Sequence, residues 1–167
     1  LILAQPPLHR WACATAGGQR LYGAFIDGAW RPAAEAFGLG QQRRAMQLLT
    51  DGMWGQPKFE SWPDERIGGV MRNAAAMHAL VCSHDPFPEF DRSAVAGLTM
   101  PALLVQGAHT SALHRLVMKE LGDVMRGARR AEISSAGHGV PNENPSEFNA
   151  AVGSFLESLE PSRGNAR

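Results

Sequence analysis

Strand-like and helix-like segments alternate over residues 101–159, and this alternation constrains the fold more than any other feature of the chain. Residues 101–105 form a continuous apolar run closed by Gly107, as expected for a strand buried on both faces. A helical pattern follows over residues 111–125, a second strand over 128–134, and a last amphipathic helix begins at Asn144-Pro145. The order strand, helix, strand, helix predicts a parallel α/β sheet.

The chain before this alternation has a different pattern. Residues 1–4 predict a short buried strand, which Pro6-Pro7 ends. Apolar side chains then recur at helical spacing over three stretches, with Pro32 as an expected kink in the first: residues 19–37, 41–53 and 63–81.

These patterns predict four parts of the chain. We expect a first core strand over residues 1–8 and a helical cap over 9–95. A C-terminal core of two strands and two helices should cover 96–160, followed by a disordered tail over 161–167.

Composition excludes several classes of function. The chain has 16 Lys and Arg against 16 Asp and Glu, so its formal net charge is zero with His neutral. Such a chain is not expected to bind nucleic acid or an anionic membrane. Its apolar runs are too short for a membrane span, and residues 1–4 lack the features of a signal peptide. We therefore expect a cytoplasmic protein that acts on a small molecule.

One histidine has the setting of a catalytic base. His138 lies between Gly137 and Gly139, just beyond the strand expected at 128–134. Imidazole titrates near neutral pH, which suits it to accept and return a proton during catalysis. The flanking glycines allow a sharp turn that leaves the ring accessible. His138 is therefore the candidate general base.

Four parts of the chain carry a resemblance to a known family: the run Met100-Pro101-Ala102-Leu103-Leu104-Val105-Gln106-Gly107, the helix and strand after it, Ala136-Gly137-His138, and Asn144-Pro145-Ser146-Glu147-Phe148. Together they resemble the C-terminal half of an α/β-hydrolase fold protein. The resemblance implies three adjacent, parallel strands, with a helical cap inserted after the first. It also implies that the nucleophile elbow and the oxyanion loop precede Leu1, because the family order is nucleophile, acid, histidine. The sequence contains no Gly-x-Ser-x-Gly motif.

The resemblance places the triad acid at one of two positions, and neither holds a carboxylate. Thr110 occupies the position after the penultimate strand, and Gln5 the position after the earlier strand. Gln5 could accept the imidazole N–H and orient the ring, but it cannot stabilise an imidazolium as a charge would. Asp85 and Asp91 remain possible substitutes.

Other residues are candidates for lining the site. His109 follows a strand end and could lie at the mouth of the site. Trp11, Met53 and Trp54 could wall an apolar substrate pocket in the cap. No cluster of Cys, His and carboxylates has metal-site spacing, so neither a metal nor another cofactor is expected.

The resemblance implies a hydrolase of the esterase type for small apolar substrates, inactive as this chain alone. Two alternatives stay open: an Asp-nucleophile dehalogenase or epoxide hydrolase, and a non-catalytic protein that binds a small molecule or a partner. Residues 1–4 should also expose an unpaired strand edge, through which the chain could self-associate or bind a complementary N-terminal half.

Overall fold

The computed structural model describes residues 1–160, so the tail expected over 161–167 lies outside the described part. The chain divides into two compact units. The sheet unit comprises Leu1–Pro6, Phe90–Thr110 and residues 118–160, and the helical unit comprises Pro7–Glu89 and Ser111–Val117. Residues 90–95, expected in the cap, thus group with the sheet, and residues 111–117, expected in the core, group with the helices.

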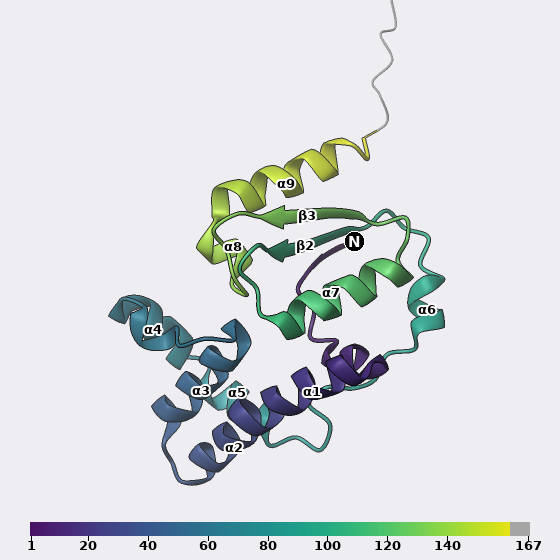
Figure 1. The fold of residues 1–167 in the computed structure, drawn as a ribbon. Coiled ribbons are helices and arrows are strands. Elements are labelled where there is room, and N and C mark those ends of the chain that lie inside the picture. Colours follow the sequence, from purple (N-terminus) through teal and green to yellow (C-terminus); the bar gives the residue numbers. More distant parts are fainter. Residues whose placement is uncertain (161–167) are drawn as a thin grey trace, which may run out of the picture. The chain divides into compact units, whose positions relative to one another are not determined.

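The described part of the sheet unit contains a parallel sheet in the order β1 (Ile2–Ala4), β2 (Leu103–Gly107) and β3 (Arg129–Ile133), shown in Figure 1. Leu103 of β2 lies opposite Ile2 on one side and Arg129 on the other. The predicted parallel α/β arrangement is confirmed. Because β2 is central, nearly all of its residues are buried, as its continuous apolar run predicted.

In the described part of the chain, β1 lies at the edge of the sheet, where the sequence predicted an unpaired strand edge. Its residues are half-buried or exposed, whereas the sequence predicted a buried strand. An edge strand has a hydrogen-bonded neighbour on one side only, which leaves part of its surface uncovered. Self-association or pairing with a complementary chain through residues 1–4 stays a prediction.

Helices cover both faces of the sheet. In Figure 1, α9 (Pro145–Glu157) runs along one face and the second half of α7 (Ala112–Val124) along the other. Phe155 of α9 packs with Leu103 and Val105, which alternate along β2 and therefore share a face. Leu156 of the same helix and Leu159 just beyond it are 51% and 44% exposed.

Side chains tie the segment after β3 to the start of α9. The Asn144 side chain accepts a hydrogen bond from the Glu147 N–H at 3.2 Å, which confirms the predicted helix cap. The Glu147 carboxylate in turn accepts from the backbone N–H and hydroxyl of Ser134, at 2.9 and 2.6 Å. Two short helices were not predicted: α8 (Val140–Glu143) in this segment and α6 (Arg92–Ala96) before β2.

The helical unit begins with η1 (His9–Ala14), a 3₁₀ helix, followed by α1 (Ala16–Phe25). Residues Ile26–Trp30 (η2) then form a wider π turn, and α2 (Arg31–Gly38) continues the path. Pro32 was expected to kink this helix. It is the second residue of α2 and follows the π turn of η2 directly, so the regular α-helical hydrogen bonding is interrupted just before the proline.

The remaining helices of this unit are α3 (Gln42–Trp54), the 3₁₀ turn η3 (Phe59–Ser61), α4 (Asp64–Met71) and α5 (Ala74–Val81). The single helix predicted over 63–81 was wrong, because the backbone of Asn73 leaves the helical region and separates α4 from α5. Leu80 of α5 is 42% exposed, while Val81 is buried. The core of the unit combines aliphatic side chains with six aromatic ones: Phe25, Trp30, Phe37, Phe59, Trp62 and Phe87.

Candidate functional site

Gln5, Thr110 and His138 follow the three strands of the sheet at the same edge. Gln5 directly follows β1, Thr110 lies beyond β2, and His138 lies beyond β3. The carboxyl ends of parallel strands meet at one edge, which is where α/β proteins place their ligand sites. Gln5 and Thr110 are buried, and His138 is half-buried. The structure therefore brings the expected base together with both positions expected for the acid.

Hydrogen bonds fix the orientation of the Gln5 amide. Its Nε2 donates to the carbonyl oxygen of Gly137 at 3.1 Å, and its Oε1 accepts from the hydroxyl of Thr110 at 2.7 Å. Because a backbone carbonyl can only accept, the NH₂ group must face Gly137. The Oε1 atom then faces Thr110 and the histidine ring.

The Gln5 amide also fixes the tautomer of His138. Its Oε1 lies 3.0 Å from the ring Nδ1. An amide oxygen can only accept a hydrogen bond, so Nδ1 must carry the proton of the neutral ring. The lone pair that can take up a proton is therefore on Nε2, as in a hydrolase whose acid holds the Nδ1–H.

Gln5 adopts a backbone conformation that is rare for its residue type. Its φ is 46°, in the left-handed region that favours glycine. Holding a non-glycine residue there costs on the order of 1–3 kcal/mol, and such residues cluster at functional sites. The backbone N–H of Gln5 still donates to the carbonyl of Val105 at 3.2 Å. The chain thus turns out of β1 while the Gln5 side chain keeps its three partners.

Close backbone packing and one carboxylate hold the turn that carries His138. A Cβ at Gly107 would overlap the carbonyl oxygens of Ala136 and Gly137, so only glycine allows β2 to end against this turn. The Glu143 carboxylate accepts a hydrogen bond from the Gly137 N–H at 2.7 Å. Sequence reasoning missed Glu143. Its signal was its position in the segment after His138, but no spacing rule assigned it a role.

The environment of His138 favours the neutral ring. Burial lowers the pKa of His138 below its ordinary value, because desolvation penalises the imidazolium, and the nearby charge of Glu143 partly opposes this effect. A neutral ring at physiological pH has the lone pair that a general base needs.

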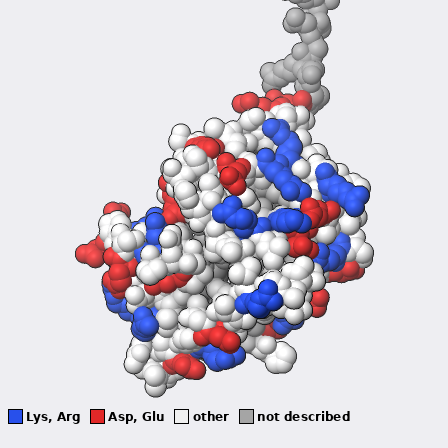
Figure 2. Space-filling view, in the orientation of Figure 1, with Lys and Arg blue, Asp and Glu red and all other residues white. Residues whose placement is uncertain are grey.

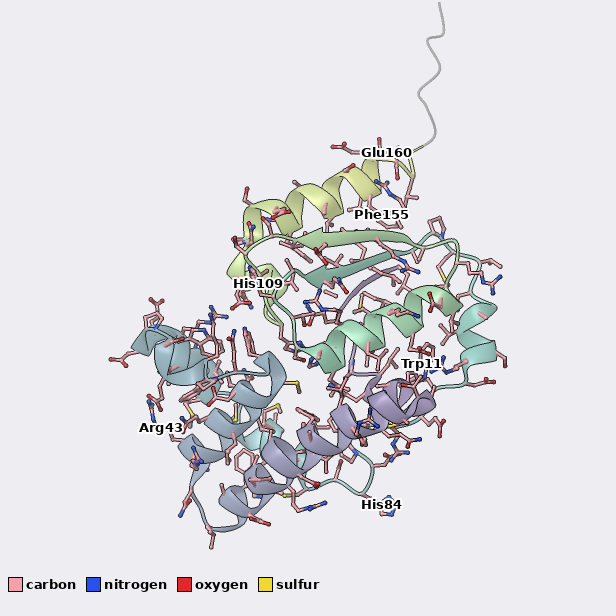
Figure 3. The ribbon with its side chains drawn as sticks, in the orientation of Figure 1. Trp11, Arg43, His84, His109, Phe155 and Glu160 are labelled. Atoms are coloured by element: carbon pink, nitrogen blue, oxygen red, sulfur yellow. The ribbon has the colours of Figure 1, made fainter. Side chains whose placement is uncertain are left out.

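His109, expected at the site mouth, is exposed on the loop after β2 (Figure 3). Its backbone N–H donates to the carbonyl of Ala136 at 2.8 Å, so it links this loop to the His138 turn. A site-lining role for its side chain stays a prediction. Of the substitute acids, Asp91 caps α6 through the Ser93 N–H, and Asp85 pairs with Arg10 in the helical unit.

The three residues expected to wall the substrate pocket belong to the helical unit. Trp11 is 3% exposed in η1. Met53 and Trp54, at the end of α3, pack against the core of the unit, where Trp54 meets Trp62 edge-on at 5.1 Å between ring centroids. A cavity of about 510 Å³ within this unit is lined by other residues, among them Phe25, Leu48 and Leu113. The pocket role of the three residues stays a prediction.

Sequence reasoning also missed a buried histidine pair in the helical unit. His9 and His114 are each 1% exposed, and their Nε2 atoms lie 3.1 Å apart. The Nδ1 of His114 lies 2.7 Å from Oγ of Ser111. His9 and His114 are 105 positions apart, so no local spacing indicated the pair. Ser111 and His114, by contrast, are close in sequence. Their spacing is the one between a helix-capping residue and the third residue of the helix that it caps.

Two searches of the described residues found nothing. Within residues 1–160, no group of three or more His, Cys, Asp or Glu side chains is arranged to hold a metal ion. Over the same range, no helix combines the length and apolarity needed to cross a membrane. Figure 2 shows acidic side chains among the basic ones on the face that it draws, in line with the zero formal net charge.

Comparisons with known proteins found no relative of this chain. No protein-family model matches it, and neither a curated protein nor a solved structure matches it.

Proposed function

We propose that the sheet unit carries the histidine part of a hydrolase centre of the α/β-hydrolase type, with a small apolar ester as substrate. One observation carries this proposal: the Gln5 amide holds Nδ1–H of His138 and so places the basic lone pair on Nε2. The position of His138 at the carboxyl edge of a parallel sheet supports it.

His138 would act as a general base and then as a general acid. Its Nε2 takes the proton from the attacking hydroxyl or water and returns it to the leaving group. Gln5 fixes the ring through Nδ1–H but, being neutral, does not stabilise the imidazolium that forms. In serine proteases, replacing the acid by its amide lowers kcat by about 10⁴, so we expect slow turnover.

Hydrolysis of p-nitrophenyl acetate tests the base role of His138 without the nucleophile elbow. The chain alone is expected to be inactive on ordinary esters, but this activated ester reacts with water or directly with imidazole. We expect His138→Ala to lower the rate of the purified chain at least about 100-fold at pH 7, the lower end of the effect of losing a general base. His84→Ala is the matched control, since it removes an exposed histidine of the helical unit. Equal rates for the wild-type chain and His138→Ala would overturn the proposal.

Gln5→Glu tests whether Gln5 occupies the position of the acid. A carboxylate at 3.0 Å from Nδ1 should raise the pKa of His138 above that of the wild-type ring, because it stabilises the imidazolium, and should increase the rate. Gln42→Glu, an exposed residue of the helical unit, makes the same charge change and should alter neither quantity. The pKa is read from the pH dependence of the His138 ring proton in NMR spectra.

A non-catalytic binding protein is the second candidate function. The neutral Gln5 in the position expected for the acid favours a binding protein, because a site that only binds a ligand does not need the carboxylate. A Gln5→Glu variant whose His138 pKa rises while its ester hydrolysis stays at the background rate would support binding over catalysis.

A further inference from the structure

The helical unit holds a second histidine cluster, separate from the one proposed above. The Oγ atom of Ser111 lies 2.7 Å from Nδ1 of His114, and Nε2 of His114 lies 3.1 Å from Nε2 of His9. Both rings are 1% exposed, whereas Ser111 is half-buried and so reachable. A hydroxyl, an imidazole and a third group that orients the imidazole form the arrangement by which enzymes activate a serine.

The hydrogen bonds run without a break from the Ser111 hydroxyl through the His114 ring to the His9 ring. When the Ser111 hydroxyl donates to Nδ1 of His114, the neutral His114 ring carries its proton on Nε2 and donates to Nε2 of His9. His9 is itself held between aromatic rings, stacked on Phe25 at 5.2 Å and edge-on to Phe87 at 4.5 Å between centroids. The third member of the cluster is therefore fixed in place by packing.

Ser111 lines an apolar cavity. The cavity has a volume of about 510 Å³, within the range of small-molecule sites. Its apolar walls include Leu21, Phe25, Leu48 and Leu113, all from the helical unit. A nucleophile at the wall of such a cavity would meet a substrate with an apolar acyl chain.

The start of α7 supplies donors beside the same hydroxyl. α7 begins at Ala112, so the backbone N–H groups of Ala112 and Leu113 lie in its first turn, where a helix offers no acceptor of its own. Both residues line the cavity. Backbone N–H groups at a helix N-terminus stabilise the negative charge that develops on a carbonyl oxygen under attack.

From this cluster, its cavity and its donors, we infer that Ser111, His114 and His9 form a serine-type acyl-transfer site for esters with an apolar acyl chain. Ser111 Oγ bonds to the ester carbonyl carbon while His114 Nδ1 takes its proton. The bond to the leaving alkoxide then breaks, and His114 returns the proton to it, which gives an acyl-serine and an alcohol. Water attacks the acyl-serine by the same route and releases the acid. His9 is a positioning residue, which holds the His114 tautomer.

An alkyl fluorophosphonate tests the nucleophile, because its phosphorus is attacked by an activated serine and fluoride leaves. The full chain is treated with the probe, and the labelled residue is identified by peptide mass spectrometry. We expect phosphonylation of Ser111 and no label in Ser111→Asn. Asparagine caps a helix as well as serine does, so this variant removes the nucleophile without removing the cap. Absence of label from Ser111 in the folded wild-type chain would overturn the inference.

Two variants and a control test the other roles. His114→Asn should slow the labelling at least about 100-fold, as loss of a general base does. Labelling of His114→Asn at the wild-type rate would show that Ser111 is not activated by His114. His9→Gln should move the midpoint of the pH profile of labelling, and an unchanged profile would contradict its positioning role. Ser154→Ala, which alters an exposed serine, is the matched control.

His138→Ala separates this inference from the proposed function. Ser111 labelling should be unchanged in that variant. Hydrolysis of p-nitrophenyl acetate is compared in the Ser111→Asn background, where the inferred serine site does not contribute, and there it should still fall when His138 is replaced by alanine. The two proposals are therefore tested at different residues, His138 for the proposed function and Ser111 for this inference.

Discussion

The two histidine clusters have similar hydrogen bonds, but one lies at strand ends in the sheet unit and the other lies among helices in the helical unit. In the sheet unit, His138 and its partners extend from strand ends and are positioned by backbone turns. In the helical unit, His9 and His114 come from η1 and α7 and are positioned by aromatic packing. Strand ends converge because parallel strands point the same way, so the sheet cluster follows from topology. The helical cluster depends on the fit of individual side chains.

This difference shows in the backbone. The sheet cluster includes Gln5 in a left-handed conformation and requires a glycine at 107. The two histidines of the helical cluster lie in a 3₁₀ helix and an α-helix, η1 and α7, and both are held by burial. The first arrangement should be sensitive to backbone changes and the second to side-chain volume.

Glycine substitutions give the largest expected effect. A Cβ at Gly107 would overlap the carbonyl oxygens of the His138 turn, and a Cβ at Gly18 would overlap the carbonyl of Ala12 in η1. Backbone atoms move less readily than side chains, so we expect each alanine variant to lose about 3 kcal/mol of unfolding free energy, measured by urea denaturation.

Gly23→Ala is the control for both variants. Gly23 lies in α1 with no atom near the added Cβ, so alanine should stabilise the chain by about 0.5–1 kcal/mol. A Gly107→Ala chain of wild-type stability, with an unchanged His138 spectrum, would contradict the close approach of the turn to β2.

Acid should weaken the sheet unit through His138. Burial lowers the folded-state pKa of His138, so the unfolded chain binds its proton more readily. Above the unfolded pKa both states are neutral and stability is unaffected. As the pH falls from there through the folded pKa, stability should be lost. His138→Gln should show less of this loss, and identical pH dependence in both proteins would contradict the assignment.

Thr110→Val has the smallest expected effect. It removes the hydroxyl that donates to Gln5 at 2.7 Å while keeping the side-chain shape. We expect a loss of about 1 kcal/mol of unfolding free energy. The ring of His138 should keep its Nδ1–H tautomer, because Gly137 still orients the Gln5 amide. A change of tautomer in ¹⁵N spectra would mean that Thr110 also controls the ring.

Local patterns predicted the sheet and its helices well. The apolar run of β2 and the Asn144 cap each depend on residues close in sequence, and both were confirmed. The break near Asn73 was missed because the apolar spacing continues across it, while the backbone conformation changes. Hydrophobic spacing indicates which face is buried and contains little information on where a helix is interrupted.

The sites were predictable only in part, for the same reason. His138 has its own local signal, and Gln5 and Thr110 were identified by resemblance. The His9–His114 pair joins residues 105 positions apart through tertiary packing, which no sequence spacing encodes. Glu143 accepts its hydrogen bond from a backbone N–H, and such a group cannot be recognised as a partner from the amino-acid sequence.

The Gln5 amide has a consequence for ionic strength. The bonds that hold the His138 ring join a neutral amide to a neutral imidazole, so dissolved ions have no charge pair to screen there. The geometry of this site should therefore persist from dilute buffer to concentrated salt, where a carboxylate–imidazolium pair would weaken. With a glutamate at position 5, the His138 ring would be more basic, but the geometry of the site would depend on the salt concentration.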